Sequence, residues 1–144
     1  MKQLLKNMIL ICAGGALYII IELLWRGYSH WTMFALGGIC FFYVGLINEE
    51  FSWETPLIGQ MFISAVIITG LELVFGMVIN GVYKLNVWDY SNMPCNFLGQ
   101  ICLPYSILWF FISLPAIVLD DYLRYWLFHE EKPRYRFLGG KQDE

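Results

Sequence analysis

Charged side chains are scarce in this sequence. Asp, Glu, Lys and Arg make up 15% of its 144 residues, whereas hydrophobic residues make up 58%. An ordinary soluble domain carries about 25% charged residues. A soluble monomer of this length cannot bury so much apolar surface. The shortage of charge therefore excludes an ordinary soluble domain and indicates an integral membrane protein.

Basic residues and metal-ligand patterns are also scarce. Nine Lys and Arg and a net charge of −3 provide no basic surface for nucleic acid, which we exclude as a partner. The four cysteines lack the CxxC or Cys/His spacing of a zinc site, and most of them fall inside apolar segments. We therefore expect free cysteines, no metal site and no other cofactor.

Motifs of hydrolytic enzymes are missing as well. The sequence contains neither HExxH nor GxSxG, and His30 and His129 fall on opposite sides of the membrane in the topology given below. We therefore expect no catalytic residues. A paired-carboxylate site formed by Glu72 and Asp89 is the enzymatic alternative, because the sequence does not determine the distance between them.

Long apolar segments dominate what is present. A membrane-spanning helix needs roughly 20 mostly apolar residues, and four segments approach that length: residues 4–25, 31–47, 57–82 and 101–119. Four such helices leave no room for a separate catalytic or nucleotide-binding domain. The sequence predicts an all-α, polytopic four-helix bundle in a single integral membrane domain over residues 1–144, with an amphipathic tail at 120–144.

The distribution of Lys and Arg predicts the orientation, because cationic loops resist translocation. Arg26 and Lys84 follow the first and third spans, and the other seven basic residues lie in the N-terminus and the C-terminal tail. Both termini are therefore predicted to be cytoplasmic, in a bacterial plasma membrane. The tail mixes aromatic and charged residues, which favours a helix end anchored to anionic lipid; an effector-docking surface is the alternative.

An internal repeat is visible when residues 28–40 are laid over 90–102 without gaps. Six of the thirteen positions are identical, where unrelated sequence gives roughly one. Upstream, Glu22 aligns with Glu72, each followed by leucine. The repeat predicts two tandem helical hairpins related by a parallel pseudo-two-fold axis along the membrane normal. These hairpins comprise residues 4–47 and 57–119.

Glu22 is one of two carboxylates inside the predicted spans. A carboxylate there costs about 2.5 to 3.5 kcal/mol and is a functional-site hypothesis by default. Arg26 lies one helical turn later, so it can reach back to Glu22. An interfacial ion pair is therefore the alternative to a ligand-binding role for Glu22 and Arg26.

Glu72 is the second carboxylate, and no basic residue lies within a turn of it. It shares one helix face with other small or polar residues, including Asn80, and that face must contact protein or water rather than lipid. We expect Arg26 across the pseudo-two-fold axis as its nearest charged partner and Gln100 as its nearest uncharged one. A ligand contact and a structural role between helices both remain open.

The segment at 87–106 is polar and rich in turn-forming residues for a chain about to enter a span. Its prolines and Gly99 interrupt a helix, which predicts an irregular or re-entrant outer segment before the fourth helix. Irregular backbone at membrane depth must be buried in protein or line a wet cavity. Such a cavity would be lined by Trp88, Asp89, Tyr90, Asn96 and Gln100. An interfacial cap, in which Asp89 caps a short turn, is the alternative.

Three stretches, WDYSNMPCNFLGQICLPYSILWF, WRGYSHWTMFALGG and GLINEE, together resemble the bacterial ABC-transporter type IV (permease-like) membrane proteins over residues 22–111. The matching motif positions are Trp88, Asp89, Tyr90, Asn96, Gly99, Gln100, Cys102 and Ser106. The resemblance implies a permease and brings no catalytic mechanism. A permease with four spans would need a homodimer or a second membrane subunit, together with a separate ATPase, as partners in the lipid bilayer.

Two functions follow from these observations. The first is a permease-like subunit that binds a polar or cationic small molecule in an outward-facing cavity. Its candidate ligand-binding residues are Glu22, Arg26, Glu72, Asn80, Trp88, Asp89, Tyr90, Asn96 and Gln100. The alternative is a non-transporting accessory or sensor protein that binds a lipid headgroup or a membrane partner through the same surface.

Overall fold

The computed structural model describes residues 1–138, and this part of the chain is helical with no strand. Four of its helical segments are long and apolar enough to cross a membrane. The prediction of an all-α membrane protein with four spans is therefore confirmed. The elements are α1 (Lys2–Arg26), α2 (Trp31–Gly45), α3 (Ile47–Glu50), α4 (Leu57–Gly76), the π-helical turn η1 (Met77–Val82) and α5 (Leu103–Phe128).

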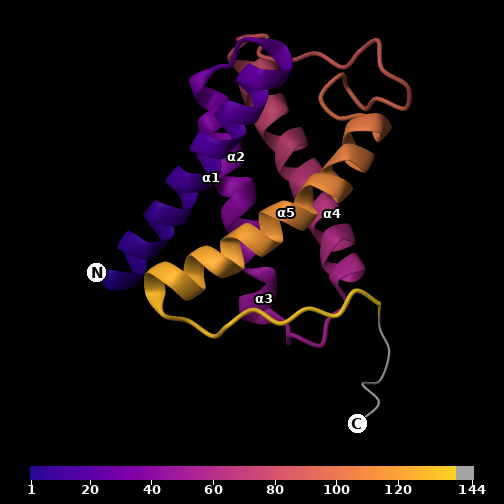
Figure 1. The fold of residues 1–144 in the computed structure, drawn as a ribbon. Coiled ribbons are helices and arrows are strands. Elements are labelled where there is room, and N and C mark those ends of the chain that lie inside the picture. Colours follow the sequence, from indigo (N-terminus) through magenta and orange to yellow (C-terminus); the bar gives the residue numbers. More distant parts are fainter. Residues whose placement is uncertain (139–144) are drawn as a thin grey trace.

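The four spans place both ends of the described chain at the same end of the bundle (Figure 1). The α1–α2 turn and the segment at 83–102 lie at the opposite end. Helix α1 packs along α2, and α5 packs against α4 and α2, whereas α1 and α5 make little contact with each other. In Figure 1, α5 crosses the molecule obliquely and approaches the start of α1 only at its own C-terminal end.

Glycines set the close approach of α1 and α2. The Cα of Gly37 lies against the ring of Tyr18, and an added Cβ would come within 2.7 Å of Tyr18 Cγ. Gly14 lies against Phe41 in the same way, with 2.6 Å from an added Cβ to Phe41 Cγ. Small residues let membrane helices approach closely, where dispersion rather than the hydrophobic effect holds them together. The α1–α2 hairpin is therefore a tight pair that positions Tyr18.

The turn between α1 and α2 is capped at both sides. Gly27 adopts a left-handed conformation (φ 78°) and donates its backbone N–H to Leu23 O, which is the usual way for glycine to end a helix. His30 Nδ1 accepts from the backbone N–H of Thr32 at 3.3 Å and so caps the start of α2. The histidine has a structural role at this position.

The end of α4 differs from a regular helix. Beyond Gly76 the backbone changes to the π-helical turn η1, which is buried at Ile79 and Asn80. Turns of this kind often occur at functional sites because they redirect a side chain without ending the helix. The segment at 83–102 then follows as irregular chain with one isolated bridge, between Phe97 and Ile101. This irregularity agrees with the turn-rich sequence before α5.

We expect Gly37→Ala to lower the midpoint of thermal unfolding in detergent, because the new methyl group would overlap Tyr18. Overpacking of this kind costs about 1 to 3 kcal/mol. Gly70→Ala is the matched control, because an added Cβ there meets no atom within 4 Å. A midpoint for Gly37→Ala equal to that of Gly70→Ala would contradict the packing described for α1 and α2.

Candidate functional site

A cavity of about 380 Å³ lies between α1 and α5 at the end of the bundle opposite the termini. Two charged side chains, Glu22 and Arg26, line it. The remaining wall is mainly aromatic and aliphatic. The aromatic residues of the wall are Tyr18, Trp25, Trp88, Tyr90, Tyr105 and Trp109.

Glu72 lies beside this cavity on α4, with only 3% of its surface exposed. Its Oε1 accepts a hydrogen bond from the Tyr90 hydroxyl at 2.9 Å, and its Oε2 accepts one from Trp109 Nε1 at 3.1 Å. No ion pair to Glu72 occurs within residues 1–138. Both carboxylate oxygens are thus satisfied by neutral donors, and the carboxylate has no cationic partner in the described chain.

The predicted partners of Glu72 were wrong. Arg26 forms an ion pair with Glu22, and Gln100 bonds to Asn80. Of its two donors, Trp109 lies 37 residues further along the chain on α5. Only the tertiary packing of α4 against α5 brings it to Glu72, so sequence spacing gave no signal for this contact.

Aromatic rings form a continuous wall next to Glu72. Tyr90 stacks on Tyr105 with their ring centroids 4.7 Å apart and an interplanar angle of 14°. Tyr105 in turn lies 6.2 Å from Trp109, and Trp109 lies 6.2 Å from Tyr18 on α1. Aromatic faces attract cations placed within about 6 Å of the ring centroid. The wall therefore adds to the attraction that Glu72 would exert on a cation.

Glu22 and Arg26 form the ion pair that was the alternative to a ligand role. Arg26 Nη2 lies 3.0 Å from Glu22 Oε1, and the Ser29 hydroxyl donates to the same oxygen at 2.7 Å. The Arg26 guanidinium also lies 4.7 Å from the ring centroid of Tyr28. The charge of Glu22 is therefore compensated within the protein, in contrast to that of Glu72.

Asn80 and Gln100 hold the segment at 83–102 against the end of α4. Asn80 Nδ2 donates to Gln100 Oε1 at 2.9 Å, and Asn80 Oδ1 accepts from Val87 N–H at 2.7 Å. The Trp88 indole N–H donates to the backbone oxygen of Gln100 at 3.0 Å, which fixes its ring in the cavity wall. The side-chain amides of Asn80 and Gln100, expected to contact a ligand, bond to each other, and Asn80 also holds Val87 next to Trp88.

Asp89 and Asn96 stabilise turns within the same segment. Asp89 Oδ1 accepts from both the backbone N–H and the hydroxyl of Ser91, and these bonds lower the pKa of Asp89. Asn96 Nδ2 donates to Ser91 O and Met93 O, while its Oδ1 accepts from Gly99 N–H. Both side chains are exposed, and neither is among those that line the cavity. Asp89 thus caps a turn, as the alternative interpretation held.

A second cavity, of about 180 Å³, adjoins the first between α1, α2, α4 and α5. Both cavities are lined by Tyr18, Ile21, Trp109 and Ile112. Glu72 is the one charged side chain that lines the second cavity. It therefore lies at the junction of an aromatic cavity and an apolar one.

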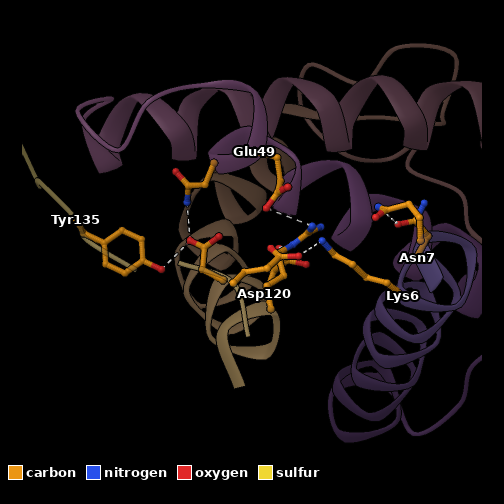
Figure 2. Close-up of polar contacts among 10 residues, drawn as sticks. Lys6, Asn7, Glu49, Asp120 and Tyr135 are labelled. Carbon is orange, nitrogen blue, oxygen red and sulfur yellow. Dashed lines mark hydrogen bonds and ion pairs between the residues drawn. The ribbon is translucent and has the colours of Figure 1, made fainter. Parts of the chain in front are cut away.

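A polar cluster that the sequence analysis missed lies at the other end of the bundle (Figure 2). Helix α5 does not end at residue 119 as predicted but continues to Phe128. Asp120, Asp121 and Arg124 are therefore buried rather than part of an amphipathic tail. Arg124 Nε donates to Asp120 Oδ2 at 2.6 Å and Arg124 Nη1 lies 3.5 Å from Glu49, so one guanidinium pairs with two carboxylates.

Contacts of this cluster join α1, α3, α5 and the segment after α5. Asp121 Oδ2 accepts from Asn48 Nδ2 at 2.5 Å and from the Tyr135 hydroxyl at 2.7 Å, and Figure 2 shows both donors converging on this carboxylate. Burial and the bond to Asp121 raise the pKa of Tyr135, so its hydroxyl stays protonated as a donor. Lys6 pairs with Glu130 and thereby links the start of α1 to the end of α5.

We expect Asn80→Ala to lower the midpoint of thermal unfolding, because it leaves Val87 N–H and Gln100 Oε1 without partners. Losing partners of buried polar groups costs about 1 to 3 kcal/mol. Asn92→Ala is the control, because Asn92 is an exposed residue of the same irregular segment. Equal midpoints for the two variants would contradict the role given to Asn80.

Comparison with known proteins identifies the family of this chain. No curated protein and no solved structure matches it at a significant level. One family model matches residues 14–129, which include most of α1, all of α2, α4 and α5, and both cavities. The matched region also includes every residue predicted to bind a ligand. The chain therefore belongs to the family described as "Putative ABC-transporter type IV".

Proposed function

We propose that the chain is a permease-like membrane subunit that binds a cationic small molecule between α1 and α5. Family membership marks it as a transport-related membrane protein. The observation that carries the proposal is Glu72, a buried carboxylate without a cationic partner in the described chain. A charged residue inside a span is costly and usually marks a substrate or ion pathway.

The surroundings of Glu72 favour a cation as the missing partner. Tyr90 and Trp109 donate to its two oxygens and fix the carboxylate in place, while their rings and that of Tyr18 form the adjoining wall. A carboxylate combined with aromatic faces is the arrangement that binds ammonium groups in proteins. Glu22 would contribute little net charge, because Arg26 already compensates it. The proposed ligand is therefore an organic cation.

The proposed topology puts the aromatic cavity on the outer side of a bacterial plasma membrane. Its support is the charge distribution, with both termini cytoplasmic because seven of the nine Lys and Arg would then be inside. Helix α3, a single turn carrying Glu49 and Glu50, would lie on the cytoplasmic side. In this arrangement α3 is available to a separate ATPase, and a homodimer or a second membrane subunit would complete the transport pathway.

We also propose that the two helical hairpins are a tandem repeat within one domain. Its support is the identity between residues 28–40 and 90–102 together with the alignment of Glu22 and Glu72. In this proposal, the irregular segment before α5 is the outer, re-entrant element of the second hairpin. Divergence after duplication would then have left Glu22 with an internal cation and Glu72 without one.

A second candidate is a non-transporting accessory or sensor that binds a lipid headgroup or a membrane partner. The exposed Leu24 and Trp25 at the cavity rim favour it, because they would face the bilayer at headgroup level. Native mass spectrometry from mild detergent discriminates the two. A specifically retained phospholipid favours the accessory role, and a protein without bound phospholipid favours the permease subunit.

Glu72→Gln tests cation binding. We expect wild-type protein to bind tetramethylammonium and Glu72→Gln to bind it at least tenfold more weakly, which is about 1.4 kcal/mol. The measurement is isothermal titration calorimetry on protein in lipid nanodiscs. Glu50→Gln is the control, because Glu50 is an exposed carboxylate at the other end of the bundle. The proposal is wrong if Glu72→Gln and Glu50→Gln bind tetramethylammonium equally well.

Cysteine labelling in intact cells tests the topology. Cys95 is exposed in the segment at 83–102, so we expect a membrane-impermeant maleimide to label it from outside. A Ser52→Cys variant that also carries Cys95→Ser should be labelled only after the cells are permeabilised, because residue 52 lies in the exposed α3–α4 loop. The reverse pattern would invert the proposed orientation.

A further inference from the structure

The second cavity extends from Glu72 towards the end of the bundle that carries the termini. Apart from Glu72, its wall is apolar and comes from four helices, with Leu17 on α1, Phe41 on α2, Ile68 on α4, and Ala116 and Leu119 on α5. From Trp109 to Leu119, α5 rises by about 15 Å. The cavity is thus an elongated apolar space that begins at the one carboxylate lining it.

The bilayer side of this cavity is open because α1 and α5 both pack on α2 but make little contact with each other. Figure 1 shows the two helices converging only at the end where Lys6 pairs with Glu130. Leu17 and Ile21 lie at this opening, with 36% and 47% of their surfaces exposed. A ligand with an alkyl chain can therefore enter sideways from the membrane without passing through water.

We infer that the ligand of the proposed cation site is a single-chain amphiphile with an ammonium head group. Its head would lie beside Glu72 against the rings of Tyr18 and Trp109, and its alkyl tail would lie in the second cavity along Ala116 and Leu119. This inference rests on the proposed function and adds the tail and the lateral route. The argument for a cationic rather than an anionic head is charge complementarity, because Arg26 is already paired with Glu22 and Glu72 is not paired with a cation in the described residues.

Two probes separate the head site from the tail site, namely tetramethylammonium, which has only the head, and dodecyltrimethylammonium, which has both. Ala116→Phe fills the second cavity. We expect it to weaken dodecyltrimethylammonium binding at least tenfold and to leave tetramethylammonium binding unchanged. Glu72→Gln should weaken both. Binding is measured in nanodiscs as the change in tryptophan fluorescence, because Trp88 and Trp109 line the head site.

Two further variants keep this test decisive. Leu17→Trp narrows the same cavity from α1 and gives the same expectation if Ala116→Phe does not fold. Ala65→Phe is the matched control, because Ala65 lines a shallow groove between α4 and α5 on another face, and neither probe should be affected. Dodecyl sulfate serves as the anionic counterpart and should not bind in a manner that depends on Glu72.

The outcomes are distinguishable. If Ala116→Phe and Leu17→Trp leave dodecyltrimethylammonium binding unchanged while Glu72→Gln still weakens both probes, the tail inference is overturned and the cation site stands. If Glu72→Gln changes neither probe, the proposed function itself fails. Dodecyl sulfate binding that equals dodecyltrimethylammonium binding would overturn the charge preference. A diazirine at the end of the dodecyl chain should label residues 112–119 and 14–21, and labelling confined to the groove around Ala65 would also overturn the tail inference.

Discussion

A carboxylate in a membrane-spanning helix must obtain its hydrogen bonds from the protein, because lipid offers no donors. Glu72 obtains them from the Tyr90 hydroxyl and the Trp109 indole. These two donors belong to the irregular segment and to α5, so the placement of both elements depends on this one acceptor. The Asn80–Gln100 bond holds the irregular segment in register with it. The same contacts leave Glu72 without a cationic partner in the described chain, which is the observation behind the proposed cation site.

Buried carboxylates have different surroundings at the two ends of the bundle. At the end with the termini, Arg124 lies between Asp120 and Glu49, and Lys6 pairs with Glu130. Ion pairs of this kind fix helix positions, and Asp121 beside them accepts only from the neutral donors Asn48 and Tyr135. At the other end, neutral donors satisfy Glu72 and aromatic rings surround it. Glu72 differs from Asp121 in that it lies at the junction of two cavities, where a ligand that brings its own charge has room to bind.

Hydropathy and helix-ending residues were sufficient to locate the spans, because each must match the thickness of the bilayer. They failed at the end of α5, where Asp120, Asp121 and Arg124 look like the start of a polar tail. Those residues remain helical and buried because their partners come from α3 and the segment after α5. The partners of the site residues could not be predicted for the same reason. Local spacing identified the Glu22–Arg26 pair as an alternative, but the partners of Glu72 come from distant segments that no local pattern connects.

The central claim is that a cation takes the place beside Glu72 that no Lys or Arg of the described chain occupies. Tetramethylarsonium has the shape and charge of tetramethylammonium, and its arsenic atom scatters anomalously. A crystal structure of the protein with this cation should show an anomalous peak beside the Glu72 carboxylate, between the rings of Tyr18 and Trp109. A site without a peak there, or peaks only at exposed carboxylates such as Glu50, would contradict the claim.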